Sequence, residues 1–561
     1  MIFHRYSLFL FVGILLLASV SYGQWAVVPV NHPVYPFLER METKGLISGY
    51  FDATLPLDEG QICQFLNQLD NSKTALTAVD RGWLLYFRKE FWEWDWGTHP
   101  ESHQISGWQN ARKIGFLQWL KVGNFWKRSH DWFSGYGDNY AWTVNPILRV
   151  DYAHDDNYDH TIWRRTSGLS FRMVWHSRIG LFFRFHDTTE QGNGPYYNRN
   201  QVFNDRYGYI GPLLGDDFTY YDCTDYGIHF RWGRIHLEAG KWQNRWGPGL
   251  YGHLLLSDEG TSFDQIRLKV DISDWGQITA LTGALKQYPP VGDTLYLSST
   301  GQFRVVEMSK FISAHRIDVK PFPTFELGFS EMVVYADRGM VLGYLIPLNL
   351  YFSAQHYYGD QDNVMWAVDA KFTGIRGARC YGEFLIDDLT ISKLGTSFWG
   401  NKLAGLVGGW WTDPVGLPNM SVGTELALIR PYVYIHQFAE NLPTHWTRPL
   451  GHWSPPNSLT WTIGGTYQPV RSIELSVRFD YQKQGVNTDS LNVGSDPYFP
   501  HRLSDPEDVS FLAGNIHESQ SMSVSISWEF LPRFHAMVLG GKRSEPLGDS
   551  KWIQAGFYLN F

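Results

Sequence analysis

Tryptophan recurs beside asparagine and arginine in three long polar segments of this sequence. Indole faces stack on the C–H faces of sugar rings, and amide and guanidinium groups form hydrogen bonds with hydroxyls. The pattern predicts a carbohydrate-binding surface, although tryptophan is equally common where a protein wall meets the lipid interface. The candidate binding residues are Trp242, Asn244, Arg245, Trp246, Tyr251, Trp399, Trp446, Arg448 and Trp453.

Carboxylates stand close together at Glu383, Asp387 and Asp388, which raises the question of an acid–base pair. On one strand Glu383 and Asp387 would lie about 13 Å apart, whereas glycoside hydrolysis needs a separation of roughly 5–9.5 Å. We therefore interpret them as solvated carboxylates near arginine and lysine. The sequence also lacks HExxH, CxxC, Walker and GxSxG patterns, so we expect no enzyme activity.

Residues 247–252 match the spacing GxGxxG, but dinucleotide binding requires a preceding buried strand and a following helix. We expect these glycines to let a compact loop fold tightly, for example into the interior of a barrel. The acidic segments 154–160 and 360–363 lack a complete ligand pattern for a metal. The cysteines at 63, 223 and 380 form neither a disulfide framework nor a zinc site. We expect no cofactor and no metal.

The 561-residue chain is rich in aromatic residues (16%) and low in charged ones (18%), whereas soluble domains have about 25% charged residues. Mean hydropathy is only −0.28 although 43% of the residues are hydrophobic, and these residues are spread along the chain. The net charge of −9 argues against a nucleic-acid partner. Residues 1–23 have the pattern of an export signal, and we expect cleavage between Gly23 and Gln24.

Residues 24–141 differ from the rest of the chain in the period of their apolar positions. Helical spacing is found at 33–46, 59–69 and 79–91. This part predicts a small, mainly helical domain. Its bounds are 24–141, and its location follows only from the family resemblance given below.

From about Tyr140 onward the apolar residues alternate with polar ones, most clearly at 265–272, 472–481 and 521–528. Strict alternation predicts strands with one apolar and one wet face. A soluble sandwich would satisfy this pattern too. The length of residues 142–561 and their aromatic content favour an all-β transmembrane barrel whose apolar face meets lipid.

The ends of the expected strands set their number and direction. Phe557, Leu559 and Phe561 share one face of a terminal strand, which resembles the signal that outer-membrane barrels present to their assembly machinery. Short turns alternate with long loops, such as 188–224 and 483–519, and predict about 18 antiparallel strands with the short turns in the periplasm. Long loops at 242–262 and 336–361 would either plug the barrel or leave it open.

Several short stretches follow one another in a distinctive order. They are 31–47, 240–257, 315–318, 344–348, 359–363 and 383–388. In this order they resemble the capsule assembly protein Wzi family of bacterial outer-membrane proteins, and the run from Arg245 to Gly249 is the most distinctive. The resemblance implies an eighteen-stranded barrel with a periplasmic helical part and a lectin-like role, in which capsular polysaccharide is held without chemistry.

The hypothesis is therefore a non-enzymatic, multi-pass barrel of the bacterial outer membrane that binds or organises capsular or other surface polysaccharide. Its expected partners are that polysaccharide, outer-membrane lipid and the barrel assembly machinery. The alternative is a porin or channel for small solutes or oligosaccharides, because a barrel of this size has room for a pore.

Overall fold

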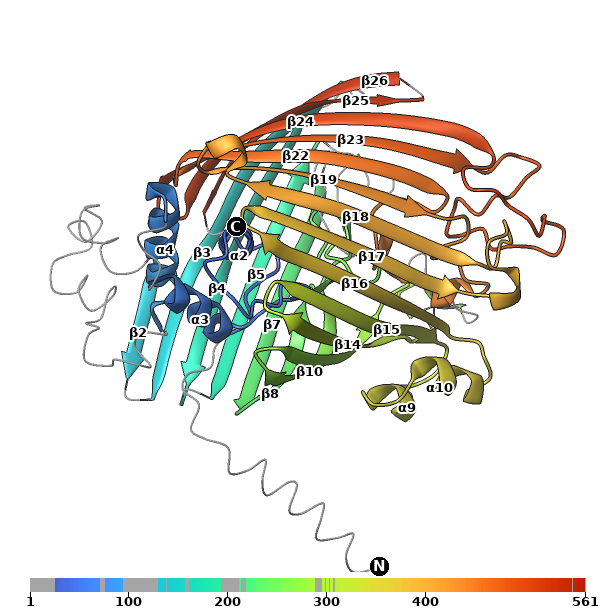
Figure 1. Cartoon of the computed structure of the whole chain (residues 1–561), viewed down its shortest axis with the longest axis horizontal. Coiled ribbons are helices and arrows are strands. Elements are labelled where there is room, and N and C mark those ends of the chain that lie inside the picture. Colours follow the sequence, from blue (N-terminus) through green and yellow to red (C-terminus); the bar gives the residue numbers. More distant parts are fainter. Residues whose placement is uncertain are drawn as a thin grey trace, which may run out of the picture.

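The two-residue alternation that begins near Tyr140 forms a closed barrel of 18 antiparallel strands (Figure 1). The ring closes where β26 (Gly548–Leu559) pairs with β3 (Tyr140–Asp155). Closure leaves no unpaired strand edge in a membrane. This computed structural model describes residues 26–70, 76–93, 130–137, 139–156, 161–176, 178–192, 211–212, 218–287, 295–297, 299–301, 303–305, 308–546 and 548–559.

Consecutive strands of the wall are neighbours in the ring, as expected for an up-and-down barrel. The short strands β2 (Phe133–Gly137) and β6 (Gly211–Pro212) pair with β3 and β7. The other wall strands are β4 (Ile162–Trp175), β5 (Ile179–Gln191), β7 (Phe218–Trp232), β8 (Ile235–Trp242), β10 (Phe263–Ser273), β11 (Gly276–Leu285), β14 (Lys310–Phe322), β15 (Phe325–Ala336), β16 (Asn363–Ile375), β17 (Ala378–Asp388), β18 (Lys402–Thr412), β19 (Met420–Ile429), β22 (Ser458–Val470), β23 (Ile473–Val486), β24 (Asn515–Leu531) and β25 (Phe534–Glu545).

Strand β24 illustrates how the two faces of the wall arise. Its apolar side chains Met522, Val524 and Ile526 are 51%, 46% and 48% exposed. The serines between them lie on the opposite face, and Ser523 pairs with Arg478 of β23, whose guanidinium contacts residues in the interior. The apolar face therefore points outward and the hydroxyl face lines the lumen, as the alternation predicts.

Short turns lie at one end of the barrel and long loops at the other, with two exceptions. The connection from β3 to β4 spans only 156–161 and is shorter than the turn 413–419 at the opposite end. Glu545 pairs with Gly548 at the long-loop end, so the connection between β25 and β26 is short although a long one is expected there. The last strand consequently ends on the side of the short turns. None of the described helices combines the length and the apolar character needed to span a bilayer.

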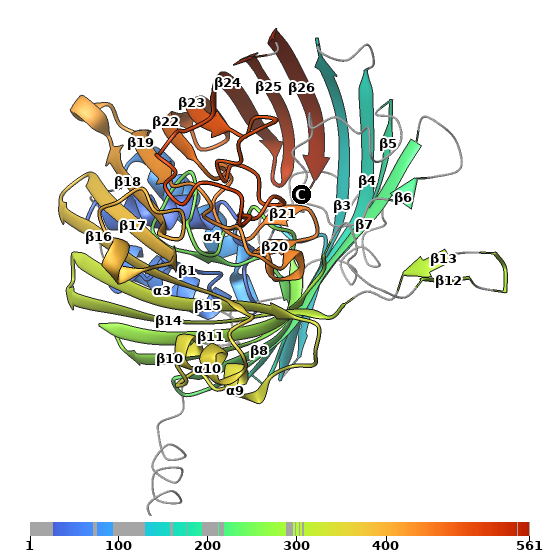
Figure 2. The same ribbon diagram turned by 90° about the vertical axis from the view of Figure 1, so that its right-hand side faces the viewer.

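The helices expected near the N-terminus are confirmed as α2 (Val34–Thr43), α3 (Glu59–Asp70) and α4 (Ala78–Glu90). Their apolar faces share a buried core. Figure 2, which looks into the ring, shows them within its outline. Arg40 Nη2 lies 2.6 Å from Asp413 Oδ1 in the turn after β18, so this segment occupies the short-turn end of the lumen.

Buried ion pairs attach this N-terminal segment to the wall. Lys371 Nζ lies 2.9 Å from Glu42 Oε2 and also pairs with Asp52, which is bound in addition by Arg379. Burial alone would raise the pKa of the Asp52 carboxyl, but Arg379 and Lys371 hold that pKa well below its usual range. We call Glu42, Asp52, Lys371 and Arg379 the ionic clamp.

Residues 337–362 form a hairpin with the short helices α9 (Leu342–Leu345) and α10 (Tyr351–Tyr357). Tyr344 and Tyr351 bury the outward-facing Val333 and Tyr335 of β15, so the hairpin covers the outside of the barrel (Figure 1). The alternative that this loop plugs the lumen is therefore wrong. We call residues 337–362 the outer hairpin.

Glu331 on the outer side of β15 holds this hairpin in place. Its Oε2 accepts a hydrogen bond from Tyr351 N at 2.8 Å, and its Oε1 accepts from Phe352 N and Trp366 Nε1, both at 2.8 Å. Two backbone donors at the start of α10 are thereby satisfied by a wall carboxylate, which also lies 3.1 Å from His315 Nε2 of β14.

We expect Glu331→Ala to detach the outer hairpin at a local cost of about 2–4 kcal/mol, because two buried N–H groups lose their acceptor. Limited proteolysis of the purified protein should then cut within 337–362 while the barrel stays intact. The control is Glu518→Ala, since Glu518 is exposed on β24 and pairs with Lys483 of the neighbouring strand, away from the outer hairpin. Equal protease resistance of both variants would contradict the proposed role of Glu331.

Candidate functional site

Residues 243–262 fold into the lumen instead of projecting outward, and we call them the inner loop. Their strand β9 (Arg245–Trp246) pairs with β1 (Thr54–Leu55) of the N-terminal segment. Trp246 and the residues from Leu254 to Leu256 are buried against inward-facing apolar residues of β10 to β19. The inner loop and the N-terminal segment therefore form one packed body inside the barrel.

Glu383 of β17 anchors the inner loop. Its Oε1 accepts a hydrogen bond from Gly249 N at 3.0 Å, and its Oε2 accepts one from Leu254 N at 2.8 Å. Gly247 has a φ of 114°, and a Cβ at this position would collide with the Glu383 carboxylate. The interpretation of Glu383 as a solvated carboxylate is wrong, because only 3% of its side chain is exposed. The GxGxxG spacing thus serves a close backbone approach.

A second carboxylate, Glu425 of β19, orients the tip of the inner loop. Its Oε2 accepts hydrogen bonds from Leu250 N at 2.9 Å, Tyr251 N at 3.2 Å and the Tyr381 hydroxyl at 2.8 Å. The Tyr251 ring then passes over Gly464 of β22, where any Cβ would collide with its hydroxyl. The Tyr251 side chain is therefore directed at one part of the wall.

Tyr251 forms a cluster with Trp453 and Arg478. The Arg478 guanidinium carbon lies 5.3 Å from the Tyr251 ring centroid and 5.7 Å from that of Trp453. Trp453 Nε1 donates to the Tyr251 carbonyl at 2.9 Å. Burial raises the pKa of the Tyr251 hydroxyl to about 12, so it stays protonated and able to donate a hydrogen bond. Two aromatic faces and a cation are thus fixed side by side.

The wall around this cluster is polar and half-exposed. Arg478 Nε lies 2.9 Å from both oxygens of Asp480, which also accepts from Thr462 Oγ1 at 2.7 Å. Ser476 and Ser525 exchange a hydrogen bond of 2.6 Å. We call the inward-facing residues of β22 to β24 the polar wall. Sugars are bound in this way by rings beside hydroxyl, carboxylate and guanidinium groups.

The structure brings together only two of the residues singled out in the sequence, Tyr251 and Trp453. Arg478 and Asp480 were missed, although the alternation in 472–481 already places both on the polar face of a strand. The sequence does not indicate that the members of this cluster lie close together, since Trp453 and Tyr251 are separated by 202 residues.

Four of the other candidates lie in the interior. Trp242 is buried, and the guanidinium carbon of Arg267 lies 5.5 Å from the centroid of the Trp242 ring. Asn244 Nδ2 donates to Gln265 Oε1 at 2.8 Å, and Trp246 is 1% exposed. Arg245 Nη2 lies 2.9 Å from Glu39 Oε1 of the N-terminal segment. These side chains make contacts within the protein, and a glycan-binding role for them stays a prediction.

The remaining candidates lie in the long loops, apart from the cluster at Tyr251. Trp399 stacks on His501 with ring centroids 3.9 Å apart, and Tyr432 meets its edge. The Trp446 side chain is half-buried, and its backbone N–H donates a hydrogen bond to the backbone carbonyl of Lys286 at 2.8 Å. Arg448 pairs with His445 in a short two-stranded sheet. A sugar-binding role for Trp399, Trp446 and Arg448 also stays a prediction.

The terminal positions differ in what the structure describes. Phe557 is 65% exposed on the outside of β26, whereas Leu559 is 2% exposed. Phe561, Gly23 and Gln24 lie outside the described residues. The assembly signal and the cleavage site therefore stay predictions.

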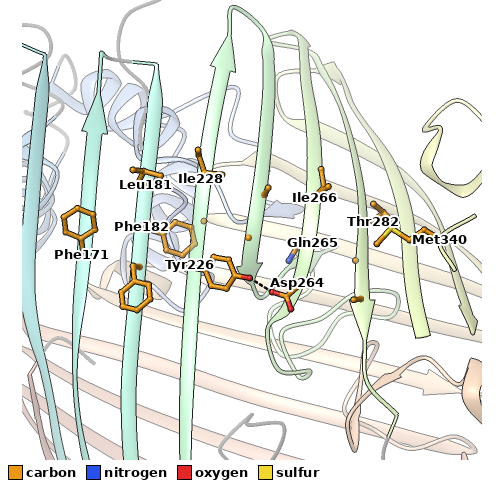
Figure 3. A pocket seen from close by; sticks show the side chains of 16 residues that line it. Phe171, Leu181, Phe182, Tyr226, Ile228, Asp264, Gln265, Ile266, Thr282 and Met340 are labelled. Atoms are coloured by element: carbon orange, nitrogen blue, oxygen red, sulfur yellow. Dashed lines mark hydrogen bonds between the residues drawn. The ribbon is translucent and has the colours of Figure 1, made fainter. Parts of the chain in front are cut away.

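An apolar groove of about 660 Å³ lies on the outer face of the wall, away from these residues (Figure 3). Its rim carries Tyr226, whose hydroxyl donates to Asp264 Oδ1 at 2.7 Å, and its floor carries glycines of β7, β8 and β11. Exposed Ile228 and Ile266 flank it. With so few polar groups it belongs to the outward apolar surface and is unsuited to sugar.

Comparison with known proteins agrees with this architecture. A family model described as capsule assembly protein Wzi matches residues 226–543. Wzi of Escherichia coli, an outer-membrane protein involved in group 1 capsule assembly and a carbohydrate-binding β-barrel, has a TM-score of 0.57 and 14% identity over 96% of this chain and 99% of that chain. No curated protein matches the sequence.

Two further solved structures are similar at a lower level. OprD of Pseudomonas aeruginosa has 9% identity and a TM-score of 0.41 over 74% of this chain and 94% of that chain. OccAB4 of Acinetobacter baumannii has 10% identity and a TM-score of 0.43 over 75% of this chain and 97% of that chain.

The family match covers more than half of the chain and includes the wall from β7 to β25 together with both anchors of the inner loop. The resemblance inferred from the sequence is thereby confirmed, as are the closed barrel and its place in the outer membrane. The chain belongs to the capsule assembly protein Wzi family of bacterial outer-membrane β-barrels.

Proposed function

We propose that this protein binds surface polysaccharide at the polar wall and performs no chemistry on it. The observation that carries the proposal is the cluster of Tyr251, Trp453 and Arg478, because it holds two aromatic faces and a charged donor at fixed positions on a half-exposed surface. Carbohydrate binding by the Wzi barrel of Escherichia coli supports the same class of ligand. Weak contacts would add along a repeating chain.

A channel for small solutes is the second candidate. Its support is the same half-exposed polar wall, which leaves polar groups available along one side of the lumen. The N-terminal segment occupies the short-turn end of the lumen, where Trp83 reaches Gln468 of β22, and the inner loop lies inside the barrel; both are tied to the wall by hydrogen bonds and ion pairs. This arrangement favours binding over free passage. Planar-bilayer recordings decide between them, since a steady large conductance would support the channel.

The barrel would also contact the periplasm, the assembly machinery and outer-membrane lipid. Residues 24–141 would act as a periplasmic part that closes the short-turn end, and the assembly machinery would read the last strand. The support is the position of α2 to α4 at that end and the outward Phe557. Outer-membrane lipid would cover the outward apolar residues.

Trp453→Ala combined with Arg478→Gln should weaken retention of extracted surface polysaccharide by the purified protein about tenfold or more, because a stacking face and a charged donor contribute roughly 1–3 kcal/mol together. The matched control is Trp528→Ala, since Trp528 is 51% exposed on the outward face of β24. The proposal fails if the control and the double variant retain polysaccharide equally well.

A further inference from the structure

Two histidines and an aspartate meet between the N-terminal segment and the barrel wall. His229 of β7 and His236 of β8 face inward, and Asp58 immediately precedes α3. Their exposed fractions are 1%, 0% and 2%. Asp58 Oδ1 accepts from Gln61 N at 2.8 Å and so caps the helix, which leaves Oδ2 for another partner.

The spacing of the three side chains fits a metal ion better than it fits hydrogen bonds. His229 Nε2 lies 3.3 Å from His236 Nδ1, which lies 3.3 Å from Asp58 Oδ2. All three ligand atoms are within 4.8 Å of one another. The edge of a tetrahedron around Zn²⁺ is about 3.3 Å when each ligand is about 2.0–2.1 Å from the ion, whereas a hydrogen bond between such groups is usually about 2.9 Å.

The neighbouring carboxylate Asp271 orients the central ligand. Its Oδ2 lies 2.9 Å from His236 Nε2. With the proton of His236 on Nε2, the lone pair of Nδ1 points at His229 and Asp58. Metal-binding histidines commonly donate their second ring N–H to a carboxylate in this way. Asp58 Oδ2 is buried, and among the described residues its contact with His236 Nδ1 at 3.3 Å is too long for a well-formed hydrogen bond, which is a second sign of a missing ligand.

The surrounding charges leave room for a cation. Arg267 is bound to Glu238, whose other oxygen, Oε1, lies 3.8 Å from His229 Nε2. A polar cavity of about 640 Å³ at the short-turn end reaches Asp271, together with Arg231 and Lys269. Asp271 interacts electrostatically with both of these cations, and Asp58 interacts with Arg231. The cavity provides an entry path from the periplasmic side.

We propose that Asp58, His229 and His236 bind one divalent transition-metal ion that links the N-terminal segment to the barrel wall. Two imidazole nitrogens and one carboxylate oxygen suit Zn²⁺, with water or Glu238 as the fourth ligand. The sequence did not reveal this site, because Asp58 lies 171 positions before His229 and the seven-residue spacing of His229 and His236 alone matches no metal-binding motif.

The test uses the full mature protein in detergent, stripped with a chelator, incubated with micromolar ZnSO₄ and passed over a gel-filtration column. Elemental analysis should find about one Zn²⁺ per chain. We expect at least a tenfold loss of retained zinc in H229N/H236N. Asp58→Asn should also lose it, while asparagine preserves the helix cap. Heat-modified migration on gels verifies that each barrel is folded.

The control is H356N/H517N, which removes two exposed histidines and should retain zinc like the unchanged protein. A wild-type protein that retains no zinc would overturn the proposal. So would equal retention by folded H229N/H236N, because the metal would then be held by other surface groups.

Discussion

Replacing Lys371 with alanine is expected to lower the free energy of unfolding by about 3–5 kcal/mol, because the three buried carboxylates Glu42, Asp52 and Glu326 would then share two cations, Lys320 and Arg379. Lys371 Nζ lies 2.9 Å from Glu42 Oε2 and 3.0 Å from Glu326 Oε2, and it also pairs with Asp52. Each of these side chains is at most 4% exposed. Urea unfolding would measure the loss, and trypsin should cut the loosened N-terminal segment first.

Lys542→Ala is the matched control for this prediction. Lys542 Nζ lies 2.7 Å from Asp549 Oδ2, but the two side chains are 57% and 55% exposed. An exposed pair contributes about 0–1 kcal/mol, so this variant should unfold almost like the unchanged protein. If Lys371→Ala behaved in the same way, the ionic clamp would have no role in attaching the N-terminal segment.

Glu383→Ala is expected to release the inner loop from the wall. Two buried backbone donors, Gly249 N and Leu254 N, lose their acceptor, and a cavity remains where the carboxylate was. Each unsatisfied donor costs about 1–3 kcal/mol, which gives about 3–5 kcal/mol in all. Because Tyr251 follows directly in this loop, polysaccharide retention should fall together with stability. Conductance should rise as the loop loses its fixed position.

Asp388→Ala separates this effect from a general change of charge on β17. The Asp388 side chain is 57% exposed, and its Oδ2 lies 3.7 Å from Lys402 Nζ. The Asp388→Ala variant should bind polysaccharide and resist protease like the unchanged protein. Unchanged retention in Glu383→Ala would show that the tip of the inner loop does not contribute to the binding surface.

The barrel was predictable because its signal is local. Alternation such as Met522, Val524 and Ile526 against serines appears within one strand, and the face that meets lipid follows directly from it. The N-terminal helices were predictable for the same reason, since Leu38 and Met41 have helical spacing. The short connections from β3 to β4 and from β25 to β26 depart from the expected rhythm.

The paths of the long loops were not predictable, because distant side chains decide them. Glu383 and Gly249 are 134 residues apart, and no pattern in either segment indicates that they meet. One signal was available for the outer hairpin. Glu326 and Glu331 are five positions apart on one strand, so they lie on opposite faces, and one of them had to be covered on the lipid side.

The ionic clamp also bears on the order of assembly. Lys371 and Arg379 belong to β16 and β17 in the middle of the chain, whereas β26, which completes the ring, is synthesised last. A curled, unfinished sheet containing β16 and β17 already offers the cations that Glu42 and Asp52 require. The N-terminal segment can therefore dock while the sheet is open, and closure then traps it without threading.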